Sequence, residues 1–202
     1  MTKIAAPSAS RRAVFLDRDG TVADEVGYVN HASRLRLLPR SAEAVRKIRE
    51  TGFLAVVVTN QAGVARDYFE EFVVGETHER LKALLAEQGA SLDGIYYCPH
   101  HPKEGIAPYR QDCQCRKPRP GMLVQAARDL GIDLARSYMV GDGIVDVGAA
   151  RAAGVVPVLV LTGYGRGHFE HRRSRWSAQP EHIAEDLFDA VEWILERERR
   201  AS

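Results

Sequence analysis

The stretch Ala13-Val14-Phe15-Leu16-Asp17-Arg18-Asp19-Gly20-Thr21 decides how this chain folds and where its chemistry lies. Its four leading apolar residues are typical of a buried strand, and two carboxylates and a glycine follow directly. Ligands of open α/β sheets bind at the carboxyl ends of the strands. Two carboxylates held there repel each other unless a cation neutralises them, and Mg²⁺ takes carboxylate oxygens together with substrate phosphate. A solvated acidic turn without a metal would have the same local sequence. The rest of the chain therefore decides between such a turn and a metal site.

Outward from this stretch, apolar runs alternate with amphipathic segments. This pattern predicts a three-layer, Rossmann-like α/β fold: a mainly parallel sheet with helices on both faces. Strands are expected at 13–16, 53–58, 94–97, 138–140 and 155–161, and helices at 41–50, 70–88, 121–130, 144–153 and 181–199. Ser41 is expected to cap its helix, and Pro157 to place its strand at an edge or a bulge. The basic segment 163–180 is expected to be a loop.

Length and composition indicate one domain. We place it at 13–202, with a Cys- and His-rich loop at 98–118, after a polar segment 1–12 that we expect to be flexible. Lys and Arg total 28 against 27 Asp and Glu, a balance that argues against a nucleic-acid-binding surface. The chain has no apolar run of membrane-spanning length and no apolar core of a secretory signal near Met1. We therefore expect a cytoplasmic monomer with a small-molecule substrate and no membrane partner.

Two further predicted strands also end in polar residues. Thr59 and Asn60 follow the second strand, and Asp142 follows the fourth. In a parallel sheet these positions converge on the edge that holds the first acidic pair. Asp17, Asp19 and Asp142 can supply oxygen ligands to one Mg²⁺, while the Thr59 hydroxyl and the Asn60 amide suit a phosphoryl oxygen.

Two cations, Arg116 and Lys117, precede the predicted helix at 121–130. A transferring phosphoryl group develops charge that a metal on one side and a Lys or Arg on the other can stabilise. Lys117 can serve as a point charge, and Arg116 can bind phosphate through two parallel hydrogen bonds. Beside the acidic strand ends, this pair favours phosphoryl-transfer chemistry.

All three cysteines lie in one loop, and two histidines follow the first of them. Cys98 and His100 form one close pair in sequence, and Cys113 and Cys115 form a second. Three thiolates and one imidazole at this spacing predict a closed, structural zinc site. His101 is a competing ligand, although the matching spacing of the two pairs favours His100. Such an ion would fix the loop that carries the two cations.

The ordered motifs resemble the haloacid dehalogenase superfamily of aspartyl-phosphate phosphatases. The matching motifs are Phe-Leu-Asp-Arg-Asp-Gly-Thr at 15–21, Thr-Asn-Gln at 59–61, Lys117, and Gly-Asp-Gly-Ile-Val-Asp at 141–146. Together they span most of the predicted domain, and their order makes the resemblance specific.

This resemblance implies a role for each matching position. Asp17 would be the nucleophile, and Asp19 the general acid and base. Thr59 and Lys117 would hold the phosphoryl oxygens. Mg²⁺ would bind the Asp17 carboxylate, the Asp19 backbone carbonyl and Asp142. A covalent aspartyl phosphate divides one difficult displacement into two easier ones.

The zinc loop narrows the resemblance to the D,D-heptose 1,7-bisphosphate phosphatases. The matching segments are Tyr-Tyr-Cys-Pro-His-His-Pro at 96–102, Cys-X-Cys-Arg-Lys-Pro at 113–118 and Gly-Tyr-Val at 27–29. The substrate-binding positions that this implies are Glu25, Tyr28, Thr59, Asn60, Gln61, Arg116 and Lys117. Gly143 departs from the family, which often carries a lysine there.

The resemblance implies a Mg²⁺-dependent phosphatase that removes the 7-phosphate of a heptose 1,7-bisphosphate, in nucleotide-activated heptose biosynthesis. Histidinol-phosphate phosphatase is the second hypothesis, and a non-catalytic binding protein on the same fold is the third. The intervals between the motifs leave no room for a cap domain, so loops would define the pocket. Two questions stay open: Asp146 is either an outer metal-site residue or an exposed helix residue, and segment 163–180 either binds a second phosphate or is a solvated loop.

Overall fold

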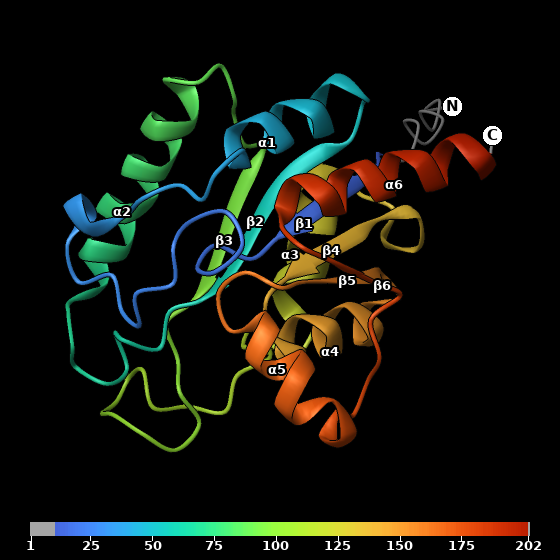
Figure 1. Cartoon of the computed structure of the whole chain (residues 1–202). Helices are drawn as coiled ribbons and strands as arrows, with labels where there is room; N and C mark the ends of the chain where they lie inside the picture. Colours follow the sequence, from blue (N-terminus) through green and yellow to red (C-terminus); the bar gives the residue numbers. More distant parts are fainter. Residues whose placement is uncertain (1–10, 202) are drawn as a thin grey trace, which may run out of the picture.

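Six parallel strands form one sheet at the centre of the computed structural model, which describes residues 11–201 (Figure 1). The strands are β1 (Ala13–Leu16), β2 (Leu54–Asn60), β3 (Gly94–Cys98), β4 (Tyr138–Gly141), β5 (Val156–Val160) and β6 (His182–Ala184). Their spatial order is β3-β2-β1-β4-β5-β6, and each neighbouring pair is parallel. The chain leaves β1 toward one edge and returns to β4 on the other side, so the topology switches direction between β1 and β4. The predicted parallel sheet is confirmed.

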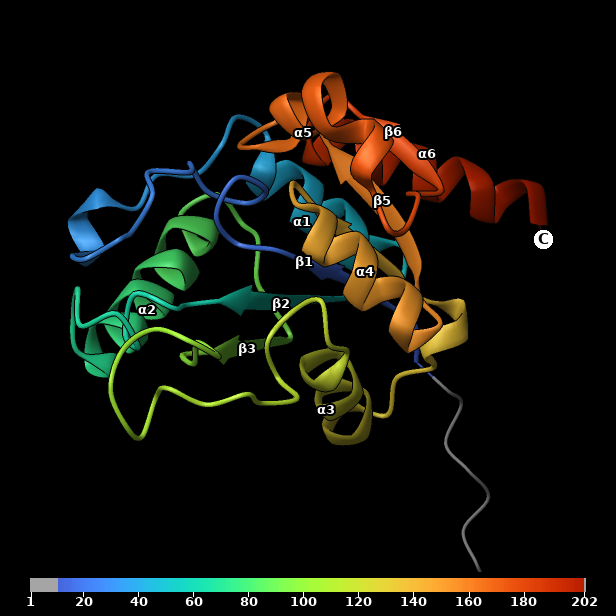
Figure 2. The same cartoon turned by 90° about the horizontal axis from the view of Figure 1, so that it is seen from below.

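Helices cover both faces of the sheet (Figures 1 and 2). They are α1 (Ser41–Glu50), α2 (Glu71–Ala86), α3 (Gly121–Leu130), α4 (Ile144–Ala153), α5 (Gly165–Arg172) and α6 (Leu187–Ala201). Val14 and Leu16 of β1 pack in the core that includes α1, α2 and α6, whereas Ala13 and Phe15 pack in the core with α3 and α4. Alternate side chains of one strand therefore reach opposite layers, as a doubly covered strand requires. Among residues 11–201, no helix is long and apolar enough to cross a membrane.

The start of α1 differs from the prediction. Ser41 is the first helical residue rather than the cap, and the cap position is Arg40, in a left-handed conformation with φ 59°. Ser41 donates its backbone N–H to Leu38, and its hydroxyl is buried without a hydrogen-bond partner. The chain enters the helix through a tight turn at Arg40, which rotates the Ser41 side chain into the core and away from the first turn.

Pro157 does not mark an edge or a bulge, because β5 lies between β4 and β6 in regular register. Val156 donates its backbone N–H to Ser137, just before β4, so the Pro157 nitrogen faces the β6 side. The first β6 residue in the ladder, His182, pairs with Val158, one position beyond the proline. The missing N–H therefore falls before the β5–β6 ladder begins, and an interior strand tolerates it.

The segment predicted as a loop, 163–180, contains helix α5 and the 3₁₀ turn η3 (Arg173–Arg175). The segment predicted as one closing helix, 181–199, contains β6 before α6. Helix α5 has two glycines and five charged or histidine side chains, so it lacks the apolar stripe that predicts a helix. Strand β6 has three residues, too few to separate from a helical pattern by periodicity alone.

The expectation of a flexible N-terminus falls mostly on residues 1–10, which lie outside the described part. Of the two remaining residues, Arg11 donates its backbone N–H to Gly131 at 3.0 Å, and Arg12 forms an ion pair with Glu198 of α6. These two residues therefore belong to the packed domain.

Candidate active site and metal centres

The carboxyl ends of β1, β2 and β4 border one open pocket of about 690 Å³. Nine of the predicted site residues line it: Asp17, Asp19, Glu25, Tyr28, Thr59, Asn60, Gln61, Lys117 and Asp142. The pocket lies where the strand order reverses, which is the usual ligand position in a sheet of this type. Arg116 is absent from the lining.

Lys117 lies at the buried base of this pocket. Its Nζ is 2.9 Å from Asp17 Oδ1 and 2.6 Å from Asp146 Oδ1, and it donates a hydrogen bond to the Val58 carbonyl at 2.8 Å. Burial disfavours the charged form, but the charges of Asp146 and Asp17 overcome this and raise the Lys117 pKa. Lys117 therefore stays protonated, and its ammonium group is held by three oxygen atoms.

Three buried or half-buried carboxylates meet beside this cation. Oxygen atoms of Asp17, Asp142 and Asp146 all lie within 4.8 Å of one another. Burial, opposed by Lys117, raises the Asp17 pKa to about 7, and burial together with the charges of Asp17 and Asp146 raises the Asp142 pKa to about 8. Carboxylates this close resist joint ionisation, so the oxygen set fits a divalent cation such as Mg²⁺, which would stabilise the charged forms.

Glycine at position 20 is required for this cluster to form. Gly20 has φ +77°, and a Cβ added there would lie 2.2 Å from Asp142 Oδ2. The same oxygen accepts a hydrogen bond from the Tyr164 backbone N–H at 2.8 Å. The Asp-X-Asp-Gly stretch thus provides the Asp17 carboxylate after β1. Its glycine also leaves the space that the Asp142 carboxylate, after β4, occupies.

Asp146, whose place the sequence left open, is buried beside the other two carboxylates. Its Oδ1 faces Lys117, and its Oδ2 accepts the Gly143 backbone N–H at 3.0 Å at the start of α4. Both oxygens are engaged by the protein. The alternative of an exposed helix residue is therefore wrong, and Asp146 is placed to orient Lys117.

Asp19 is held by two neighbours. Arg18 Nε and Nη2 donate to the two Asp19 carboxylate oxygens at 3.0 and 2.8 Å, and Gln61 Nε2 donates to Oδ2 at 2.9 Å. The same Gln61 amide donates to the Thr59 hydroxyl at 2.9 Å. Gln61 therefore connects the carboxylate that follows β1 with the hydroxyl at the end of β2. The importance of Arg18 was not predicted, and its place between two aspartates was the one available signal.

Asn60 is engaged in a way that the sequence did not indicate. Its Oδ1 accepts the Lys117 backbone N–H at 3.0 Å, and its Nδ2 donates to the Lys117 carbonyl at 3.1 Å. The amide expected to contact a phosphoryl oxygen thus already bonds to the backbone of the loop. Its observed role is to attach that loop to the end of β2.

One wall of the pocket comes from segments that sequence reasoning did not assign to the site. Tyr164 and His168, before and within α5, line the pocket together with Glu25. The Tyr164 side chain hydrogen-bonds to Glu25, whose charge raises the Tyr164 pKa, while burial raises the pKa of Glu25. His168 Nδ1 is buried and has no hydrogen-bond partner among the described residues. The basic composition of 163–180 was the signal, although it did not identify these residues.

Tyr28 forms the adjoining part of the wall. Its ring packs edge-on against Tyr68 with centroids 4.8 Å apart, and its hydroxyl accepts a hydrogen bond from Arg66 at 2.6 Å. Arg66 also pairs with Glu104 of the cysteine-rich loop at 3.0 Å. The predicted substrate-binding Tyr28 is therefore held in place by two other loops.

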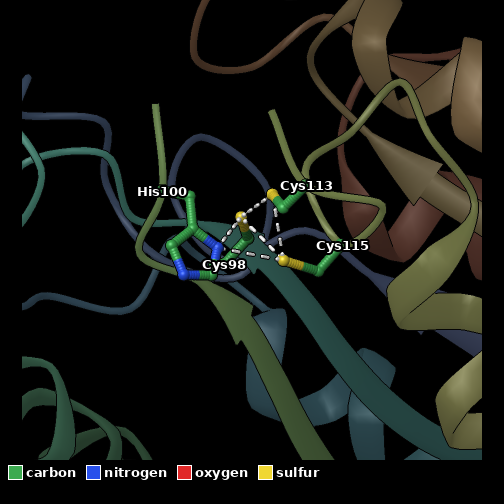
Figure 3. A group of neighbouring side chains, drawn as sticks. All are labelled: Cys98, His100, Cys113 and Cys115. Atoms are coloured by element: carbon green, nitrogen blue, oxygen red, sulfur yellow. Dashed lines mark hydrogen bonds between the residues drawn. The ribbon is translucent and has the colours of Figure 1, made fainter. Parts of the chain in front are cut away.

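A second group of ligand atoms lies in the cysteine-rich loop. The side chains of Cys98, His100, Cys113 and Cys115 converge on one point (Figure 3). The sulfur–sulfur distances are 3.1, 3.2 and 3.4 Å, and His100 Nδ1 lies 3.3 and 3.6 Å from the sulfurs of Cys115 and Cys98. Zinc bonds of about 2.3 Å to sulfur would separate tetrahedral sulfurs by about 3.8 Å. A small expansion of this group thus accommodates one such ion.

The competing ligand His101 points elsewhere. Its Nδ1 accepts backbone N–H groups of Lys103 and Glu104 at 3.3 and 2.8 Å. Hydrogen bonding with Cys98 and Cys113 lowers the Cys115 pKa to about 5, against its burial, so the group already favours a thiolate at that position. Arg116, the next residue, donates to the His100 carbonyl at 3.1 Å, which links the loop to the four-ligand group.

Comparisons with known proteins identify similar chains. The HAD-hydrolase-like family model matches residues 114–190. A D-glycero-D-manno-heptose-1,7-bisphosphate 7-phosphatase of Thermosynechococcus vestitus is 46% identical over 192 residues, 91% of this chain and 95% of the relative. A D-glycero-beta-D-manno-heptose-1,7-bisphosphate 7-phosphatase of Escherichia coli K12 is 48% identical over 75% of this chain and 80% of the relative.

A solved structure gives the same result at the level of the fold. The crystal structure of D,D-heptose 1,7-bisphosphate phosphatase from B. bronchiseptica, complexed with magnesium and phosphate, superposes with a TM-score of 0.80 at 34% identity. The match covers 92% of this chain and 99% of the other.

Proposed function

Because the chain belongs to the family of D-glycero-D-manno-heptose 1,7-bisphosphate 7-phosphatases, within the haloacid dehalogenase-like hydrolases, we propose that it removes the 7-phosphate of such a heptose bisphosphate. The chain is thus a phosphoric monoester hydrolase, and the step belongs to nucleotide-activated heptose biosynthesis. The observation that carries the proposal is the contact of Asp17 with Lys117 beside Asp142 at the base of the pocket.

The Asp17 carboxylate attacks phosphorus in this proposal, and the bond between phosphorus and the C7 oxygen breaks. Lys117 reaches Asp17 Oδ1 already, so its ammonium group lies next to the point of attack and can neutralise charge on the phosphoryl oxygens. The Thr59 hydroxyl, oriented by Gln61, donates to another of these oxygens. Asp146 and the Val58 carbonyl keep the Lys117 side chain in this orientation.

Asp19 transfers the protons. It donates a proton to the leaving C7 oxygen while the aspartyl phosphate forms. It then takes a proton from the water that attacks this intermediate, which releases inorganic phosphate and restores Asp17. Asp19 lines the pocket two positions after the nucleophile Asp17, and this position suits both steps.

Two metal ions complete the proposal. Asp17, Asp142 and the Asp19 backbone carbonyl would hold Mg²⁺, which when bound supplies positive charge to the crowded carboxylates and the phosphoryl oxygens. Cys98, His100, Cys113 and Cys115 would hold a structural Zn²⁺, since four protein ligands leave no position for substrate. A zinc ion held by these four residues would stabilise the loop that places Lys117 in the pocket.

The remote part of the substrate meets the loop walls. Glu25 and Tyr28 line the pocket and can bind sugar hydroxyls. Arg116, which precedes the pocket residue Lys117 in the chain, supplies a cation for the second phosphate. We also propose that the protein acts in the cytoplasm as a monomer, without nucleic-acid or membrane partners. The near balance of 28 basic and 27 acidic residues supports the absence of a nucleic-acid partner.

A substrate comparison tests the proposed function. We expect the highest kcat/KM on one anomer of D-glycero-D-manno-heptose 1,7-bisphosphate, with lower values on the other anomer, on histidinol phosphate and on p-nitrophenyl phosphate. Phosphorus NMR should show loss of the 7-phosphate and retention of the 1-phosphate. Asp17→Asn, which keeps the shape of the side chain, should lower turnover by several orders of magnitude while leaving the fold intact. Faster hydrolysis of histidinol phosphate, or release of the 1-phosphate, would contradict the proposal.

A further inference from the structure

Arg18, between the two aspartates that follow β1, has a side chain that is 1% exposed. Its backbone carbonyl accepts the N–H groups of Val22 and Ala23 at 3.0 and 2.9 Å, which closes a tight turn. Its charge lies close enough to His78 of α2 to disfavour protonation of that imidazole, which burial also opposes. The guanidinium is therefore an interior group, enclosed between the β1 turn and α2.

A buried guanidinium is costly to fold unless a carboxylate pairs with it in good geometry. Asp19 provides that pair: Nε and Nη2 of Arg18 contact Oδ1 and Oδ2 at 3.0 and 2.8 Å, a two-point arrangement that fixes the carboxylate plane. The Asp19 side chain keeps 20% of its surface exposed, on the side of the pocket. Arg18 thus holds the carboxylate from the interior and leaves its other side open to substrate.

The contacts also distinguish the two Asp19 oxygens. Each carboxylate oxygen has two lone-pair sites. Oδ2 accepts hydrogen bonds from both Arg18 and Gln61, so both of its sites are used. Within residues 11–201, Oδ1 accepts a hydrogen bond from Arg18 alone, which leaves one site free. Oδ1 is therefore the oxygen able to carry a proton toward the pocket.

We propose that Arg18 is a positioning residue, which together with Gln61 orients Asp19 so that Oδ1 exchanges the proton with the leaving oxygen. This inference rests on the acid–base role of Asp19 in the proposed function. During phosphoryl transfer the proton moves from Oδ1 to the leaving oxygen as its bond to phosphorus breaks. In the second step the attacking water returns a proton to the same oxygen. Arg18 itself touches no reacting atom and keeps its charge throughout.

The test compares two probes of similar size that differ in their need for an acid. Benzyl phosphate expels an alkoxide, which requires a proton, whereas p-nitrophenyl phosphate expels a stable phenolate, which does not. Arg18→Gln should lower kcat/KM on benzyl phosphate by about 100-fold or more, the usual range for lost acid–base assistance, and on p-nitrophenyl phosphate by less than about tenfold. Arg18→Lys keeps the charge without the two-point geometry, so its loss should have the same selectivity and be smaller.

Asp19→Asn is the reference for this pattern, and Arg46→Gln on the exposed face of α1 controls for loss of one arginine. The double variant Arg18→Gln/Asp19→Asn should be no slower than Asp19→Asn alone, because both changes remove the same function. Circular dichroism and bound zinc establish that each variant is folded, and if Arg18→Gln is not, Arg18→Lys decides the test. One outcome would overturn this inference and leave the proposed function standing. In it, Asp19→Asn loses more kcat/KM on benzyl phosphate than on p-nitrophenyl phosphate, whereas the Arg18 variants lose the same factor on both probes. Equal losses for Asp19→Asn as well would overturn both the acid role of Asp19 and the inference.

Discussion

Lys117→Met is the substitution whose consequences follow most directly from the structure. Methionine fills a similar volume but removes the ammonium group that lies 2.9 Å from Asp17 and 2.6 Å from Asp146. Breaking a buried ion pair by removing one partner costs about 3–5 kcal/mol, because the other charge stays buried without compensation. The Val58 carbonyl also loses its hydrogen bond. We expect the free energy of unfolding to fall by about 3 kcal/mol, since Asp17 can escape part of the penalty by taking up a proton.

Urea unfolding of wild type and variant, without added Mg²⁺ and at one pH near 8, measures this change. The double variant Lys117→Met/Asp146→Asn removes one of the stranded carboxylates, so it should be more stable than the Lys117→Met variant. The deviation from additivity should be about 0.5–3 kcal/mol, as for residues in direct contact. Activity should fall by at least about 100-fold on every phosphate ester, because Lys117 neutralises the phosphoryl group common to all of them. A stability change under about 1 kcal/mol in Lys117→Met, or additive effects in the double variant, would refute the buried ion-pair network.

Three further expectations concern the zinc group, a buried histidine and the remote phosphate. Elemental analysis of the purified protein should find one zinc per chain, and Cys113→Ser should lose zinc and stability together. Zinc-free protein, prepared without chelator, would rule the zinc site out. His78 is buried, and this together with the charge of Arg18 lowers its pKa to about 3, so the unfolded chain binds more protons between about pH 6.5 and pH 3. The free energy of unfolding should therefore decline as pH falls through that window, by at most about 1.4 kcal/mol per pH unit. Urea unfolding at pH 7 and pH 5.5 should show a smaller decline for His78→Leu than for the wild type. Arg116→Ala should lower kcat/KM on the heptose bisphosphate about tenfold more than on p-nitrophenyl phosphate, as loss of one charged hydrogen bond predicts, and equal losses would remove Arg116 from recognition of the second phosphate.

The sequence by itself determined the sheet, the edge where the site lies and the four side chains that converge in the cysteine-rich loop. Parallel strands carry their ends to one side, so Asp17, Thr59 and Asp142 could be placed together from their positions after apolar runs. The Cys-X-His and Cys-X-Cys pairs predicted this group, because their matching short spacings favoured His100 over His101. The membership of the family follows from the same ordered motifs.

Tertiary structure decided the details that depend on side-chain direction and on packing between distant segments. Asp146 proved to be buried against Lys117, and the Asn60 amide bonds to the backbone of that residue instead of standing free. Tyr164 and His168 reach the pocket just before and within helix α5, whose apolar stripe is too weak for the sequence to predict a helix there. The spacing of apolar residues along the sequence predicts strands and helices. These contacts, however, form between loops that follow different strands, so no local sequence pattern predicts them.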